Sequence, residues 1–583
     1  MRPVFSRYAL VVFLLLVASC IPAARISAQE SPTPAPSETP FATPLPSESP
    51  SPEATPTQTP TTAPSGSPPA TPAPLPLVAN PASVQSNIGA ARDVNIQGAS
   101  GTLSATLDPK IAAVTINGST VTVSPIVNGR ATLHVVDAAG ASVDIPLRVA
   151  PNAGTIARQL ALKVTGEPVD PNFIATQAAL AVRQATSANP GTTVTIGQVA
   201  PPASPLGIGG QLALSVPVSI LGGDQYLDVN DATQINVQNV AAAPFEPMVL
   251  YYSDDPERIL SDGILFRGSV SQQPVRIYDY HENGSDPRRL VVALSTSSTA
   301  ASSVHVIEAF AGPNIDVMSV GHAVTKNFLI SKPRNQGVIV DLPDGAPFLA
   351  RDVLLGFRQG VADVADFRVL SGGPVTITVL AVSPNVAPAT LLDGPVLPGD
   401  GKGRHGTFSL SNYGAQTLEY TAGGDDASVT LGDREPTVPT ADPKDPGADF
   451  GDYGVMFDLA LNVHNPTDAA QTVYLYEAPR GGPVRASYLV DGAATPTELG
   501  CATSPPNATS PPHRYLIAQF ELTPRSSQAH IVRTMTDGGS NYPIEVGLTA
   551  QVPQPATPAI SAPDGCFPKP QPSAAPEPAP GLP

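Results

Sequence analysis

The chain lacks tryptophan, has only three cysteines and carries fewer basic than acidic residues, with 31 Lys and Arg against 49 Asp and Glu. Its formal net charge is therefore −18. Binding to nucleic acid requires basic side chains that neutralise phosphates, and the sequence shows no basic stripe. We therefore expect no nucleic acid partner.

Long apolar runs are also missing, because no stretch beyond the first residues has the length of a transmembrane helix. Arg2 and Arg7 precede an apolar run at residues 8–17, which has the length of a signal-peptide core. We expect this segment to direct export and any membrane anchor to be N-terminal.

The apolar run ends in the sequence VASC at residues 17–20, which resembles the bacterial lipobox. This resemblance implies that Cys20 receives a diacylglyceryl group and becomes the first residue of the mature chain. The alternative is ordinary cleavage after Ala28, which would discard Cys20 with the signal.

The other two cysteines, Cys501 and Cys566, form a natural pair in an exported chain. We predict a disulfide between them that forms only after export. A bridge across a loop of this size contributes about 4 kcal/mol in the chain-entropy model.

Proline and glycine are abundant, with 69 and 48 residues, which argues against helical bundles and favours strands and turns. Residues 31–76 are almost entirely Pro, Ser, Thr and Ala with scattered Glu, a composition that predicts a disordered, extended stalk. The fold class predicted for the rest is mainly β, with tandem Ig-like β-sandwiches and one small α+β domain. The expected divisions are a signal peptide at 1–19, a stalk at 20–77, domains at 78–150, 151–235, 236–385 and 400–552, and a proline-rich tail at 553–583.

The first domain shows short alternating segments separated by turn signals such as Asn117-Gly118. Its segment at 128–140, NGRATLHVVDAAG, resembles the end of bacterial Ig-like and pilus-associated β-domains, which serve as spacers and adhesion modules. The strands expected here lie at 94–97, 111–116, 120–123, 131–136 and 142–149.

In the second domain, Asp170 is placed to cap a helix that has Pro171 at its first position. We expect this helix to run to about Ala188 and to be the only one in the protein. Strands at 160–165, 192–196 and 212–220 complete the small α+β unit.

The two remaining domains contain blocks that match in one order, which indicates two tandem β-sandwiches. The expected matches are 266–271 with 407–412, 275–280 with 416–420, 292–309 with 459–478, and 368–381 with 533–550.

The sequence shows no transition-metal motif and no nucleophile elbow, so we expect no cofactor and no enzyme activity. Aspartates in the loop at 442–452 leave calcium binding open as an alternative.

Two pairs of tyrosines, Tyr278 with Tyr280 and Tyr474 with Tyr476, are either part of the core or a ligand-binding face, because residues i and i+2 share one side of a strand. The expected function is a structural or adhesive surface protein outside the cytoplasm, with a lipid-held membrane anchor and an unidentified protein partner. The alternative is a protein that binds a glycan or another envelope polymer.

Overall fold

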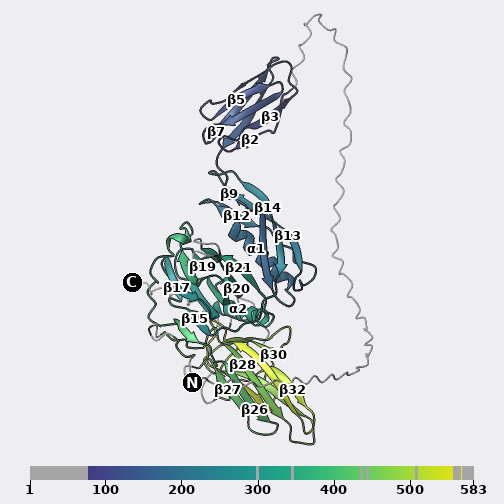
Figure 1. Cartoon of the computed structure of the whole chain (residues 1–583), viewed down its shortest axis with the longest axis vertical. Helices are drawn as coiled ribbons and strands as arrows, with labels where there is room; N and C mark the ends of the chain where they lie inside the picture. The colour runs from purple at the N-terminus through teal and green to yellow at the C-terminus, as the bar shows by residue number, and fades with distance from the viewer. Residues whose placement is uncertain are drawn as a thin grey trace, which may run out of the picture. The chain divides into compact units, whose positions relative to one another are not determined.

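The computed structural model of the protein describes residues 76–296, 301–342, 347–433, 438–441, 444, 447–505, 510–555 and 566. This part of the chain is mainly β, as the composition predicts, and its strands and helices follow one another in the order shown in Figure 1. Cys20 and the predicted stalk lie outside the described residues. Among the described residues, no helix is long and apolar enough to cross a membrane.

The first domain consists of two four-stranded sheets, ordered β1-β3-β6-β5 and β2-β8-β7-β4. Alternate side chains such as Val121 and Val123 are fully buried, which is the pattern of strands with one face on a core. All five expected strands are present, while three strands of three or four residues were too short to predict. The strands are β1 (Val78–Asn80), β2 (Val84–Ser86), β3 (Arg92–Gln97), β4 (Leu103–Thr106), β5 (Ala112–Asn117), β6 (Thr120–Pro125), β7 (Gly129–Asp137) and β8 (Ser142–Val149).

The second domain packs the helix α1 (Pro171–Ala185) against a sheet ordered β12-β13-β14-β10. The Asp170 side chain accepts hydrogen bonds from the backbone N–H groups of Asn172 and Phe173, at 2.7 and 3.4 Å, so the predicted cap is confirmed. The helix ends three residues earlier than expected, because residues 187–188 pair with another short strand. The strands are β9 (Gly154–Thr155), β10 (Gln159–Thr165), β11 (Ser187–Ala188), β12 (Thr193–Ile196), β13 (Gln211–Leu221) and β14 (Val229–Asn239), and β14 crosses the expected boundary at residue 235.

The third domain, here called sandwich 1, places the strand order β21-β20-β23-β18-β15-β25 over a second sheet ordered β17-β24-β19-β22. Its first sheet continues into the second domain, because β10 pairs antiparallel with β21. The elements are β15 (Val249–Ser253), β16 (Arg258–Ile259), β17 (Gly263–Val270), β18 (Val275–Asn283), β19 (Arg288–Thr296), β20 (Ser302–Asn314), α2 (Val317–Ser331), β21 (Gly337–Leu342), β22 (Phe348–Leu355), β23 (Gly360–Ser371), β24 (Val375–Val382), a 3-10 turn at Pro388–Thr390, and β25 (His405–Ser409).

The fourth domain, sandwich 2, has the strand orders β26-β28-β33-β30-β31 and β27-β34-β29-β32. Its strands are β26 (Ala415–Thr421), β27 (Ala427–Leu431), β28 (Met456–His464), β29 (Gln471–Pro479), β30 (Val484–Val490), β31 (Thr497–Ala502), β32 (Tyr515–Leu522), β33 (Ser527–Met535) and β34 (Ile544–Thr549).

The two sandwiches share one topology, so the prediction of tandem β-sandwiches is confirmed at the level of the fold. The strands β15, β17 to β24 and β26 to β34 occupy the same places in the same order, and a β-bulge interrupts both β19–β22 and β29–β32. The expected block matches were nevertheless wrong for three of the four pairs. The block at 275–280 lies in β18, whose counterpart is β28 and not the block at 416–420, while only the closing match of β23–β24 with β33–β34 was correct.

A buried asparagine marks the corresponding turn of each sandwich. The Asn283 side-chain amide donates to the carbonyl oxygen of Leu355 at 3.2 Å, and the Asn465 amide donates to that of Leu522 at 3.4 Å. Since β22 ends at Leu355 and β32 ends at Leu522, the two bonds connect equivalent positions.

The expectation of a single helix was wrong, because α2 connects β20 to β21. Its buried side chains lie on more than one face, since α2 packs on β20 and β23 of sandwich 1 and also on β30 and β33 of sandwich 2. Figure 1 shows α2 near β20 and β30. A helix buried in this way has no single apolar stripe to reveal it, and its several valines lower helix propensity.

Candidate functional site

Buried polar side chains gather where α2 meets sandwich 2, and we call this region the junction. One side is supplied by α2, and the other by β30, β31 and the turn between β33 and β34. Gly321 of α2 lies so close to this turn that a Cβ atom would clash with the carbonyl oxygen of Gly538. The helix and the turn are therefore in backbone contact.

His322 is the central group of the junction and is only 7% exposed. Its Nδ1 lies 2.7 Å from Oδ2 of Asp537, which is fully buried, and its Nε2 lies 3.0 Å from Oε2 of Glu498. Burial by itself lowers the pKa of His322, but the two carboxylates outweigh this effect and raise it above the usual value.

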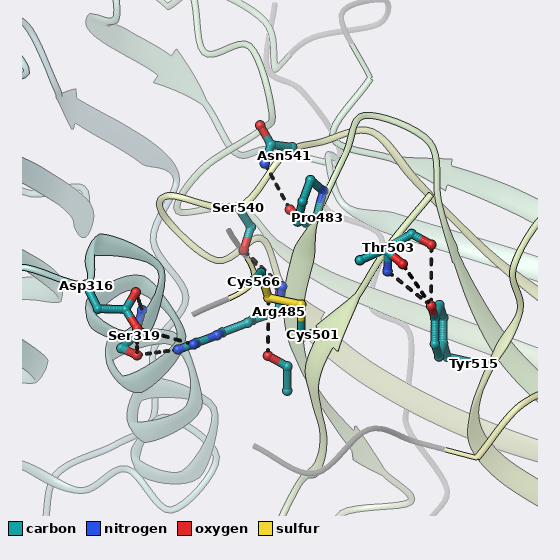
Figure 2. The surroundings of a disulfide bond; sticks show 11 residues. Asp316, Ser319, Pro483, Arg485, Cys501, Thr503, Tyr515, Ser540, Asn541 and Cys566 are labelled. Carbon is teal, nitrogen blue, oxygen red and sulfur yellow. Dashed lines mark hydrogen bonds and ion pairs between the residues drawn. A yellow bond between two sulfur atoms is a disulfide. The ribbon is translucent and has the colours of Figure 1, made fainter. Parts of the chain in front are cut away.

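Two further ion pairs connect the same elements. Lys326 Nζ lies 2.8 Å from Oε1 of Glu498. The Arg485 guanidinium of β30 bonds to the Ser319 hydroxyl and lies 3.3 Å from Oδ2 of Asp316, the N-cap residue of α2 (Figure 2). A negatively capped helix start and a cationic side chain therefore attach α2 to sandwich 2.

Behind these pairs, Glu477 is fully buried in sandwich 2 and accepts a hydrogen bond from the Tyr488 hydroxyl. Burial raises the pKa of Glu477 to about 8, and burial likewise raises the pKa of Asp537 against the opposing effect of His322. Glu477 therefore changes its charge near neutral pH.

The structure places the tyrosines of the expected ligand face in the core. Tyr278 and Tyr280 are 1% and 6% exposed and Tyr476 is fully buried, while Tyr474 is half-buried. The Tyr278 ring lies 6.0 Å from that of Tyr453, centroid to centroid. Of the two alternatives, core packing is therefore the one that holds for Tyr278, Tyr280 and Tyr476, and both faces of β18 are covered.

The loop proposed for calcium has only part of its length within the described residues. There, Asp449 accepts a hydrogen bond from the Tyr453 N–H at 2.8 Å, and Asp452 accepts one from the Val438 N–H at 3.1 Å. No group of three or more potential metal-ligating side chains occurs in the described part of the chain.

A serine, a histidine and an aspartate meet in sandwich 1 but do not form a catalytic triad. His281 Nε2 lies 3.0 Å from both Ser253 Oγ and Asp279 Oδ1, while Nδ1 lies 2.9 Å from the carbonyl oxygen of Pro256. In a triad the acid holds the nitrogen that the serine does not use. All three side chains are also almost inaccessible, so they form a structural network.

A groove runs along α1, where the second domain meets sandwich 1. It consists of cavities of 220, 620 and 460 Å³ that share Leu180 as a lining residue. At its base, Arg351 Nη2 pairs with Glu308 Oε1 at 2.6 Å, and the guanidinium lies over the Phe310 ring. Since these two charges compensate one another, this ion pair gives the groove no net charge.

Cys501 and Cys566 are joined by a disulfide, with their Cα atoms 5.5 Å apart (Figure 2). This bond connects β31, an edge strand of sandwich 2, to a residue that follows the last strand. The distance agrees with the geometry of a disulfide.

Comparison with known proteins identifies no family for this chain. No family model matches it, and no curated protein resembles it in sequence. Solved structures give distant matches only. They include Lac15 from a marine microbial metagenome, with 8% identity over 79% of this chain and 87% of that one and a TM-score of 0.09.

Two further structures are tripeptidyl peptidase 2, with 8% identity over 81% of this chain and 33% of that one, and an endo-fucoidan hydrolase of glycoside hydrolase family 107. The latter has 12% identity over 47% of this chain and 42% of that one. Their TM-scores are 0.11 and 0.12. These values are too low to assign a shared fold or a function.

Proposed function

We propose that this chain is an exported surface protein, attached to a membrane through a lipid on Cys20, whose domains have a structural or adhesive role. The observation that carries the proposal is the direct docking of consecutive domains. β10 of the second domain pairs with β21 of sandwich 1, and α2 of sandwich 1 contacts sandwich 2. Domains joined in this way transmit force and hold a binding surface at a fixed position.

The Cys501–Cys566 disulfide supports export, because such bonds persist in oxidising compartments. The N-terminal sequence also supports export, and its resemblance to a lipobox predicts Cys20 as the residue that carries the lipid.

The proposal is tested by fractionating cells that express the full chain or its Cys20→Ala variant. We expect the unaltered chain in the membrane fraction, accessible to protease added outside, and the variant in the soluble fraction. An unaltered chain that stays in the cytosol would contradict the proposal.

The second candidate is a protein that binds a glycan or another envelope polymer, and the groove along α1 is the feature that favours it. Amide side chains of Gln177 and Gln184 line the groove beside the Phe348 ring, which suits a polar chain with apolar faces. Gln177→Arg would then weaken retention of the protein on isolated envelope polymer, whereas unchanged retention would count against this groove.

A further inference from the structure

The helix α2 is an insertion that distinguishes sandwich 1 from sandwich 2. In sandwich 1 it occupies the connection from β20 to β21, whereas residues 491–496 alone connect the equivalent strands β30 and β31. The inserted helix makes the contacts between the two sandwiches described above. The feature that breaks the repeat thus adds contacts between the repeats beyond the core that they share.

Between two ionised carboxylates, the hydrogen bonds of His322 require a positively charged ring. A neutral imidazole has one N–H donor and one acceptor nitrogen, and an ionised carboxylate only accepts. His322 contacts a carboxylate at both nitrogens, at 2.7 Å for Asp537 and 3.0 Å for Glu498. With Asp537 and Glu498 both ionised, the two contacts are favourable together only while the imidazole carries two protons.

The other cationic side chains near His322 already pair with other groups. On α2 itself, Lys326 is engaged with Glu498, and from β30 the guanidinium of Arg485 is directed to Asp316 and Ser319. The other ionisable groups near the His322–Asp537 pair are acidic: Glu477 of β29, Tyr488 of β30 and Tyr542 before β34. A neutral His322 would place a nitrogen lone pair against a carboxylate in a site where the histidine is only 7% exposed.

We propose that α2 is a proton-operated latch, which holds β31 and the β33–β34 turn of sandwich 2 against sandwich 1 while His322 is charged and releases them when His322 becomes neutral. The controlling ligand is the proton. Because the junction raises the pKa of His322, the latch is closed below the usual histidine value of about 6.5 and opens as pH rises through the higher value in the folded protein.

Hydrogen exchange of the full chain, followed by mass spectrometry at pH 5.5 and 8.5 with exchange times scaled for the intrinsic rate, tests the latch. We expect amides of α2, β31 and the β33–β34 turn to exchange severalfold faster at the higher pH, because the charge on His322 that holds these elements together is then lost. In His322→Asn these amides should exchange fast at both pH values, because an amide side chain cannot gain the proton.

The matched control is His134→Asn, which removes an exposed histidine that lies 2.6 Å from Asp144 in the first domain. This variant should keep the pH dependence of the unaltered chain. If His322→Asn does not fold, Glu498→Gln replaces it, because Glu498 is at the partly exposed rim of the junction. Loss of this carboxylate should move the opening to lower pH.

Equal protection of α2 at the two pH values in the unaltered chain would overturn the proposal. An unaltered pH dependence in His322→Asn, or an unchanged midpoint in a folded Glu498→Gln, would overturn it as well. If every region of the protein lost protection to the same extent at pH 8.5, the result would also contradict the latch, because it would indicate global unfolding.

Discussion

At the scale of single residues, the most consequential side chains are ionisable groups enclosed in cores that an ordinary sandwich fills with apolar atoms. Glu477 is fully buried with a pKa raised to about 8. In the unfolded chain the Glu477 carboxyl group loses its proton near pH 4.5, whereas in the folded state it keeps the proton to higher pH. Its presence therefore lowers the free energy of unfolding as pH rises from about 4.5 to 8.

Glu477→Gln should remove this dependence, because glutamine keeps the shape and can accept the hydrogen bond of Tyr488. We expect the variant to be more stable by about 2 to 4 kcal/mol at pH 8 and unchanged at pH 4. Urea unfolding at the two pH values measures the difference, with the exposed Glu521→Gln as the control in the same sandwich. Equal effects at both pH values would show that titration of Glu477 is not the cause.

Cys501→Ser tests the disulfide, which closes a loop across a sequence separation of 65. We expect a loss of about 4 kcal/mol, because the reduced unfolded chain regains the entropy of that loop. Addition of reductant to the unaltered protein should produce the same loss, and thiol labelling of the oxidised protein should leave both cysteines unmodified. A stability insensitive to reductant would contradict the bridge.

At the scale of elements, the sequence predicted what local chemistry determines. Asp170 and Pro171 predicted the start of α1, and the alternation of apolar and polar residues predicted the strands of the first domain. Prediction from the sequence failed for features that depend on tertiary packing. The valine-rich α2 has no separate polar face, and the similar strands of the two sandwiches allowed the repeats to be matched one or two strands out of place. The junction was missed for the same reason, since His322 and Asp537 are far apart in the sequence.

Asp170→Ala tests the start of α1. Alanine cannot accept the hydrogen bonds that the N–H groups of Asn172 and Phe173 donate to Asp170. We expect the loss of these bonds to destabilise the domain by about 1 kcal/mol. The first turn of α1 should lose protection from hydrogen exchange, and Asp170→Asn should preserve it. Equal protection in the alanine variant would show that the cap is not needed.

At the scale of the whole molecule, several buried ionisable groups act in one direction. Burial raises the pKa values of Asp254 and Asp452 to about 7 and that of Glu477 to about 8, and the junction carboxylates raise that of His322. Each group binds protons more tightly in the folded state, so each loses its stabilising effect as pH rises through its folded pKa.

Opposing groups act at lower pH. The Arg276 and Lys332 side chains outweigh the effect of burial and lower the pKa of Asp366, so its stabilising effect is lost as pH falls below about 4. We therefore predict a maximum of the melting temperature near pH 4 and a decline towards pH 8, recorded by calorimetry of the full chain. A maximum at pH 8 would contradict this balance of groups.

The central claim, a surface protein held by a lipid on its first mature residue, depends most directly on the chemistry of Cys20. Mass spectrometry of the N-terminal peptide from the mature protein measures that chemistry. The account predicts a chain that begins at Cys20 and carries the mass of a diacylglyceryl group. A chain that begins at Gln29 with no acyl group would contradict the anchor.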